Sequence, residues 1–247
     1  MFFKRILSLL ICTSLFYWGC KKENRFDLIK RTGEIVEEER ILDDFESLEV
    51  HSNINVFLVQ DTVCYVKIKA GKNLLAKLQT NIDGKLLTIK NTNKGNFTRS
   101  YKNKIEVFVH FMKLNELIYK GTGPITSENV IHNDVFTFNS WDGADTVKLN
   151  LEVPLVFANI HTGVADLIVH GKANQLYAYA RGSGAFRLQN FICKNVYTNN
   201  ISSSDHYFYA ENRLEALVQY VGNTYCIGNP KEVNKTENNK GKLILNM

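Results

Sequence analysis

The chain has 247 residues, a formal charge of +5 at pH 7, and 45% hydrophobic residues. This length allows one large domain or two small ones with an apolar core, and the scattered basic residues argue against nucleic-acid binding. None of the patterns CxxC, HExxH, GxxxxGK or GxSxG occurs, so we predict no catalytic residue, no metal site and no cofactor.

The chain begins with the pattern of an export signal. Lys4 and Arg5 precede an apolar run, residues 6–18, that is too short to span a bilayer as a helix. Small Gly19 then precedes Cys20, and charged residues follow at once. This pattern resembles a bacterial lipoprotein signal, in which the cysteine is lipidated and becomes the mature N-terminus. An ordinary secretory signal or an uncleaved anchor is the alternative.

These features predict four segments: a signal peptide over 1–19, a tether over 20–44, an N-terminal β section over 45–118 and a repeat region over 119–247. Loss of the signal leaves 247 − 19 = 228 residues and removes two basic residues, so the charge falls from +5 to +3. The predicted partner is the membrane, bound through the lipid on Cys20. The predicted location is that of an exported outer-membrane lipoprotein, on either the periplasmic or the cell-surface side.

Three cysteines follow Cys20, namely Cys64, Cys193 and Cys226. An odd and sparse set in an exported chain does not form a disulfide framework. Buried free thiols are the favoured interpretation, with a Cys193–Cys226 bridge as the alternative.

Short alternating strands recur in the C-terminal half, and each is followed by a small, polar turn. The last residues of these turns lie 20, 20, 21, 20 and 19 positions apart, at Gly123, Gly143, Gly163, Gly184, Ser204 and Asn223. A fixed period of this size is typical of a solenoid, in which each repeat stacks on its neighbours. We therefore predict an all-β fold, a parallel β-solenoid (β-helix) with coils of ~20 residues, in one or two sections.

One series of residues lies in phase with the turns: Asn139, Asn159, Ala180, Asn200 and Val221. In stacked coils this series predicts a column in which asparagine side chains form a hydrogen-bonded ladder. Capping of the adjacent turns by asparagine is an equally good interpretation.

The chain also resembles the putative auto-transporter adhesin head GIN domain family, from about Phe45 to the C-terminus. The resemblance rests on three features: Phe45-Glu46-Ser47-Leu48-Glu49-Val50, Asn73-Leu74-Leu75 followed by Asp83-Gly84-Lys85-Leu86, and the turn Gly182-Ser183-Gly184. It implies a β-helical architecture, often in two parts, and a role at the cell surface of an exported protein.

The candidate ligand-binding residues are aromatic and acidic side chains near the repeated turns. Tyrosines can contact a glycan, or they can stabilise stacked coils as cross-strand neighbours. Aspartates can bind glycan hydroxyls, or they can bond the backbone of their own turn. The candidates are Tyr177, Tyr179, Tyr197, Asp145, Asp166 and Asp205.

The predicted function is a non-enzymatic adhesion or ligand-binding module that presents a solenoid face to a glycan or protein. One alternative is a carbohydrate-active enzyme, for which His161, Asp166, His170 and Arg181 are the residues that could converge. A purely structural envelope protein is the other alternative. The sequence leaves the oligomeric state open.

Two short segments, Asp61-Thr62-Val63 and Asp145-Thr146-Val147, resemble the acceptor pattern for O-glycosylation in exported proteins of Bacteroidota. Thr62 and Thr146 are therefore candidate modification sites.

Overall fold

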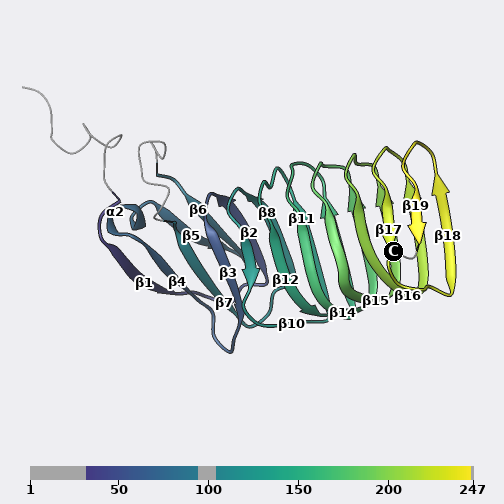
Figure 1. The fold of residues 1–247 in the computed structure, drawn as a ribbon. Coiled ribbons are helices and arrows are strands. Elements are labelled where there is room, and N and C mark those ends of the chain that lie inside the picture. Colours follow the sequence, from purple (N-terminus) through teal and green to yellow (C-terminus); the bar gives the residue numbers. More distant parts are fainter. Residues whose placement is uncertain (1–31, 94–103, 246–247) are drawn as a thin grey trace, which may run out of the picture. The chain divides into compact units, whose positions relative to one another are not determined.

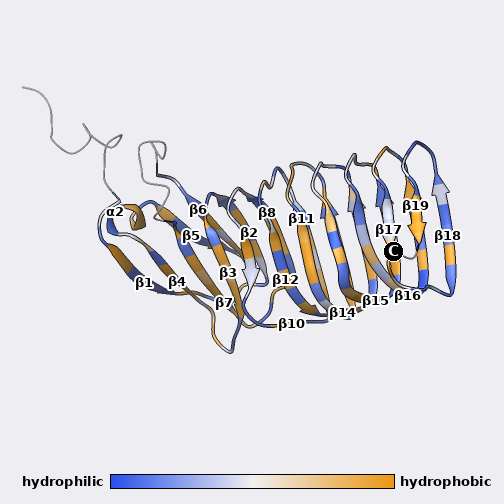
Figure 2. Cartoon of the chain, viewed as in Figure 1, coloured by the Kyte–Doolittle hydropathy of each residue, from blue (hydrophilic) through white to orange (hydrophobic). Residues whose placement is uncertain are grey.

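Alternation of buried and half-buried side chains explains why most of the chain forms strands. In strands β11 (Val135–Ser140) and β13 (Leu155–Ile160), every second residue is buried and the residues between them are half-buried. Successive side chains of a strand point to opposite faces, so one face of each strand is available for a core. The computed structural model describes residues 32–93 and 104–245, and Figure 2 shows the same alternation along its strands.

The strands form two sheets that share a common core (Figure 1). The first sheet, in hydrogen-bonding order, consists of β1 (Ile35–Ile41), β4 (Tyr65–Gly71), β7 (Glu106–Phe111), β3 (Asn55–Gln60), β9 (Ile125–Ser127), β12 (Val147–Glu152), the first parts of β14 (Leu167–Ala180), β15 (Phe186–Asn200) and β16 (His206–Val218), then β17 (Thr224–Cys226) and β19 (Leu243–Leu245).

The second sheet lies on the other side of the core. Its order is β5 (Leu78–Asp83), β6 (Leu86–Asn91), β2 (Ser47–Ser52), β8 (Glu116–Gly121), β11, β13, the second parts of β14, β15 and β16, and finally β18 (Glu232–Glu237). The short strand β10 (Ile131–His132) pairs with β12. Strands β14 to β16 therefore belong to both sheets.

The pairing register confirms the predicted parallel β-solenoid. Val135 lies beside Leu155, Leu155 beside Gln175, and Gln175 beside Asn195, all in parallel pairs. Each step is 20 residues, so the chain passes once through both sheets before it returns to the next position in the stack. In Figure 1 these coils follow one another from teal to yellow.

The core consists of the inward side chains of both sheets. Its largest fully buried members include Phe136, Phe186 and Phe208. Cys64, Cys193 and Cys226 are buried free thiols, as predicted, and burial raises the pKa of the Cys193 thiol. In residues 32–93 and 104–245 no helix has the length and apolar character needed to cross a membrane.

The glycine-rich turns stack as closely as the strands do. Gly143 and Gly163 form a parallel bridge between successive turns. Gly163 has φ +89°, and a Cβ atom there would lie 2.5 Å from the carbonyl oxygen of Gly143. A residue with a side chain would both strain this backbone and push the turns apart, which explains the glycine repeat.

The N-terminal end of the stack corrects the predicted tether. Ile35–Ile41, within the segment 20–44, forms strand β1, which pairs antiparallel with β4. Arg40 contributes to this attachment, because its guanidinium donates to the carbonyl oxygens of Leu78 and Leu75 at 2.7 and 3.3 Å. The one-turn helix α2 (Lys72–Leu75) follows β4. Residues 20–31 lie outside the described residues, as do the signal segment and Cys20.

The C-terminal end of the stack carries charged residues at interior positions. Lys235 and Glu237 of β18 pair in register with Ala216 and Val218, whose side chains are buried. The Glu237 carboxylate accepts hydrogen bonds from the backbone N–H of Leu243 at 3.0 Å and from the Lys235 ammonium at 3.1 Å. Strand β18 is accordingly hydrophilic over most of its length (Figure 2).

Candidate ligand-binding face

Aromatic side chains form a row on the outer face of the second sheet. Phe157, Tyr177 and Tyr197 occupy the same register position in β13, β14 and β15. The ring centroids of Tyr177 and Tyr197 are 4.7 Å apart, and those of Phe157 and Tyr177 are 5.3 Å apart, with nearly parallel planes in both pairs. We call these three residues the tyrosine row.

The tyrosine row stabilises the stack and also remains accessible. Offset-stacked aromatic pairs contribute about 0.5–1.5 kcal/mol beyond their buried area. Each ring covers part of the face of the next, so the outward edges and hydroxyls are the parts left for a ligand. Tyr177 is 37% exposed, and the Arg213 guanidinium lies over the Tyr197 ring at 6.0 Å.

A second row lies beside the first and carries amide groups. Asn139, Asn159, Tyr179 and Asn199 share one register position on β11, β13, β14 and β15. The Asn159 amide donates to Asn139 at 3.0 Å, and Asn139 donates to the Glu116 carboxylate at 2.8 Å. We call these four residues the asparagine row.

The asparagine row corrects the predicted column by one residue. Asn200 pairs in register with Ala180, as predicted, but this column is buried and excludes Asn139 and Asn159. The Asn200 side chain instead caps a turn, accepting from the backbone N–H of Ser202 at 2.9 Å and donating to the Gly222 carbonyl at 3.1 Å. Both interpretations of these asparagines are therefore realised, at different residues.

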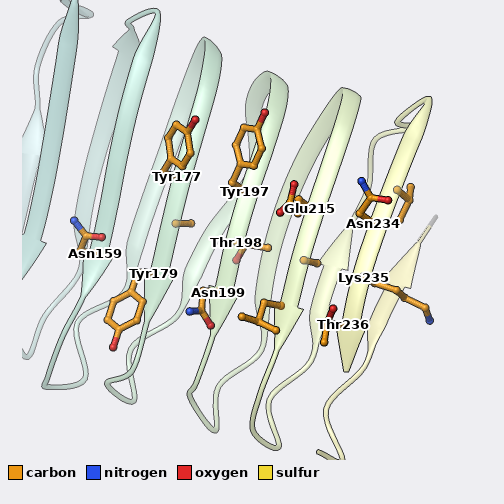
Figure 3. Close-up of a pocket in the computed structure, with 14 residues that line it drawn as sticks. Asn159, Tyr177, Tyr179, Tyr197, Thr198, Asn199, Glu215, Asn234, Lys235 and Thr236 are labelled. Atoms are coloured by element: carbon orange, nitrogen blue, oxygen red, sulfur yellow. The ribbon is translucent and has the colours of Figure 1, made fainter. Parts of the chain in front are cut away.

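An open hollow of about 780 Å³ lies over the two rows, at the C-terminal end of the second sheet (Figure 3). Five consecutive strands line it: β13, β14, β15, β16 and β18. Besides the tyrosines, its lining includes the polar residues Asn159, Asn199, Glu215, Asn234, Lys235 and Thr236.

Two further aromatic residues extend this face along the asparagine row. The Trp141 and His161 rings stack at 4.0 Å, and His161 lies 5.8 Å from Tyr179. Trp141 is 43% exposed, and partial burial lowers the pKa of His161. The sequence analysis did not place Trp141 or Phe157 in a binding surface, although each lies 20 residues before an aromatic residue on the same face.

The three predicted aspartates lie at the starts of first-sheet strands, away from the tyrosine row. Asp145 accepts from the backbone N–H of Thr146 at 2.6 Å, and Asp205 accepts from the N–H of Asn223 at 2.8 Å. Asp166 accepts from the N–H of Ala185 at 2.9 Å and pairs with Arg187 at 2.9 Å. Each carboxylate thus bonds the backbone at a turn, whereas Tyr177, Tyr179 and Tyr197 share one face.

The two threonines proposed as modification sites differ in exposure. Thr62 is exposed in the turn between β3 and β4, and its backbone N–H donates to Asp61 at 2.6 Å. Thr146 is half-buried just before β12. O-glycosylation remains a prediction, with Thr62 the more accessible candidate.

The structure brings a serine and a histidine together, but in the solenoid interior. Ser202 Oγ lies 2.8 Å from His206 Nε2, and the backbone N–H of Phe186 donates to His206 Nδ1 at 3.0 Å. Nδ1 must therefore be unprotonated, so Nε2 carries the proton and donates to the serine. A serine that accepts this proton is not activated as a nucleophile, and both side chains are buried.

Other candidates for catalysis or metal binding do not converge. Among the described residues, no recorded hydrogen bond or ion pair joins His161, Asp166, His170 and Arg181 to one another. Within the same part of the chain, no three His, Cys, Asp or Glu side chains group closely enough to hold a metal ion.

Comparison with known proteins places these features in context. The family model for the putative auto-transporter adhesin, head GIN domain, matches residues 44–230. No curated protein matches the sequence.

Several solved structures share the fold. A putative adhesin from Bacteroides fragilis has a TM-score of 0.81 at 18% identity, covering 87% of this chain and 99% of that chain. A putative adhesin from Parabacteroides distasonis has a TM-score of 0.62 at 15% identity, covering 87% and 100%. A third structure, described as a putative lipid binding protein from Parabacteroides distasonis, has a TM-score of 0.64 at 17% identity, covering 87% and 99%. At these identities the likeness shows the fold alone.

Proposed function

Because the chain belongs to the putative auto-transporter adhesin head GIN domain family, we propose that it is a non-enzymatic binding protein of the cell envelope. Its ligand is a glycan, which it holds on the outer face of the second sheet, in the hollow over the tyrosine and asparagine rows. The alternatives are a carbohydrate-active enzyme on the same scaffold and a purely structural envelope protein.

One observation supports this proposal above the others: aromatic rings and amide groups alternate in adjacent rows beneath an open hollow. Sugar rings pack their C–H faces against aromatic groups, and their hydroxyls exchange hydrogen bonds with amides. Binding sites commonly combine such apolar surface with a few polar groups that orient the ligand. An acyl chain would require an enclosed apolar cavity, so the open, polar-lined hollow favours a glycan over a lipid.

The proposed location rests on the N-terminal sequence. Cys20 follows a short apolar segment with basic residues before it, as in a bacterial lipoprotein signal. Lipidation with more than one chain is sufficient for stable anchoring. We propose an outer-membrane lipoprotein, held through the lipid on Cys20, whose side of the membrane is decided by experiment.

The binding proposal is tested by screening the purified protein against immobilised glycans. The double variant Tyr177→Ala/Tyr197→Ala should lose binding, because it removes two stacked rings from the hollow. The matched control is Tyr207→Ala/Tyr225→Ala, which removes a pair of rings stacked at 4.9 Å on the first sheet. Loss of binding in both variants, or in neither, would contradict the proposed face.

The anchoring proposal is tested by membrane fractionation of a Cys20→Ala variant. The variant should move from the membrane to the soluble fraction. Protease treatment of intact cells then distinguishes a cell-surface protein, which is digested, from a periplasmic one, which is protected. A variant that still fractionates with membranes would show that Cys20 is not the anchor.

A further inference from the structure

We infer that the ligand is an uncharged, linear oligosaccharide that lies across the strands of the second sheet with one sugar residue per coil. This inference rests on the proposed function and specifies the class of ligand for the same hollow. Three observations carry it: the repetition of the two rows, the pairing of the nearby charges, and the open ends of the hollow.

The lining repeats from coil to coil. In register, the tyrosine row continues from Tyr197 to Glu215 and then to Asn234, and the asparagine row continues from Asn199 to Leu217 and then to Thr236. Figure 3 shows these side chains side by side on successive strands.

Neighbouring strands are separated by about 4.8 Å, so equivalent side chains recur at that distance. One residue of an extended sugar chain has nearly the same length. A linear glycan can therefore meet an equivalent pair of side chains at each sugar.

The charges in and beside the hollow are already paired. Arg213 lies 3.2 Å from Glu215 and 3.5 Å from Glu232, and Lys235 lies 3.1 Å from Glu237. A uronate or sulfate group would have to displace a carboxylate from one of these cations and would meet Glu215 in the hollow. Neutral hydroxyls and acetamido groups can instead bond the amides and hydroxyls without breaking an ion pair.

The form of the hollow favours an extended chain. Its lining comes from five consecutive strands in parallel register, so the contacts follow a line across the sheet. A β-(1→4)-linked chain is extended and can follow this line, whereas an α-(1→4)-linked chain curls away from it. Because the hollow is open, it can hold an internal stretch of a longer polymer.

The test is a length series measured by calorimetry with the purified, acylated protein in a detergent without a sugar headgroup. The probes are β-(1→4)-linked oligomers of glucose and of N-acetylglucosamine, with two to six residues. For at least one series, affinity should rise by roughly threefold or more per added residue and level off near five residues, one for each lining strand. A β-(1→4)-linked N-acetylglucosamine pentamer should bind more tightly than oligogalacturonate of equal length, or the glucose pentamer should.

Two variants test the one-sugar-per-coil arrangement. Asn234→Ala/Thr236→Ala removes the polar groups of the terminal strand, so affinity should level off about one residue earlier, with the affinity for short oligomers unchanged. Tyr177→Ala, in the middle of the row, should weaken binding at every length. Tyr207→Ala, on the first sheet, is the control and should change neither.

The outcomes separate this inference from the proposed function. Tighter binding of oligogalacturonate, affinity that does not change with length, or binding confined to other glycans in the screen would overturn the inference and leave glycan binding standing. If no glycan binds in the screen, both are overturned.

Discussion

His206 illustrates what a single buried residue contributes to this fold. Its ring is fully buried, its Nδ1 accepts from the backbone of the preceding coil, and its Nε2–H donates to Ser202. Burial lowers the pKa of His206 from 6.5 to about 4, and the nearby carboxylates of Asp205 and Asp166 offset only part of this effect. A proton on Nδ1 would face the N–H of Phe186, so the folded protein requires the neutral ring.

The first prediction concerns this residue and pH. Since the unfolded chain binds the proton more readily, stability should be complete above about pH 6.5 and should decline as the pH falls toward 4. The loss attributable to His206 is about 3 kcal/mol. His206→Asn should be less stable at neutral pH but should lack this decline in urea unfolding. His132→Asn, at an exposed position, is the control and should retain it.

The second prediction concerns the thiols. Cys193 and Cys226 are buried, and burial raises the pKa of both, so neither offers a reactive thiolate in the folded protein. Alkylation followed by peptide mass spectrometry should leave both unmodified at neutral pH and should label both in denaturant. Rapid labelling of Cys193 in the native protein would contradict its placement in the core.

At the scale of elements, the turns limit how closely the coils approach. Gly163 and Gly84 both have positive φ, at +89° and +59°. They differ in their surroundings, because a Cβ at Gly163 would meet the preceding turn, whereas a Cβ at Gly84 would meet no atom within 4 Å. This pair therefore separates backbone strain from the close contact between stacked turns.

The third prediction uses this pair. Gly84→Ala should lower the free energy of unfolding by about 1 kcal/mol, the cost of left-handed backbone for a residue with a Cβ. Gly163→Ala should lower it by about 3 kcal/mol or more, because overpacking against Gly143 adds to that cost. Urea denaturation measures both. Equal losses would show that the turns do not pack as tightly as the structure indicates.

For the whole molecule, the ends of the stack need protection, since an unpaired strand edge can pair with another chain. At the C-terminal end, Glu237 is held by Leu243, Lys235 and Lys242, and the N–H of Leu243 is the main reason that its pKa falls to about 2. Its charge is therefore retained at all but strongly acidic pH.

The fourth prediction removes this protection. Lys235→Val/Glu237→Val leaves the net charge unchanged but places apolar side chains at the open end of the interior, so the protein should self-associate. Light scattering during size-exclusion chromatography should show oligomers that increase with concentration. The control is Lys69→Val/Glu106→Val, which removes an ion pair of 3.3 Å from the middle of the first sheet and should remain unassociated.

The sequence predicted the architecture because a stack of parallel coils requires a nearly constant repeat. Turns that recur every 19 to 21 residues can remain aligned only if equivalent strands lie side by side. Period-two alternation also identified outward positions, so Tyr177 and Tyr197 could be expected on one face. The same reasoning, extended by one repeat, would have included Phe157.

Details that depend on register could not be predicted in this way. The repeat between Asn159 and Asn200 is not constant, and a shift of one residue moves a side chain from the outer face to the core. That is why Asn199, and not Asn200, lies in the asparagine row. The sequence also contained no signal that Trp141 and His161 would stack.

Composition and periodicity thus determined the all-β class, the repeat length and the inward or outward direction of most strand residues, because these properties follow from local alternation and a regular stack. Tertiary structure alone decided that residues 35–41 join the first sheet, that the aspartates serve the turns, and that five strands form one hollow. These outcomes depend on contacts between residues far apart in the chain, and local pattern carries no information about such contacts.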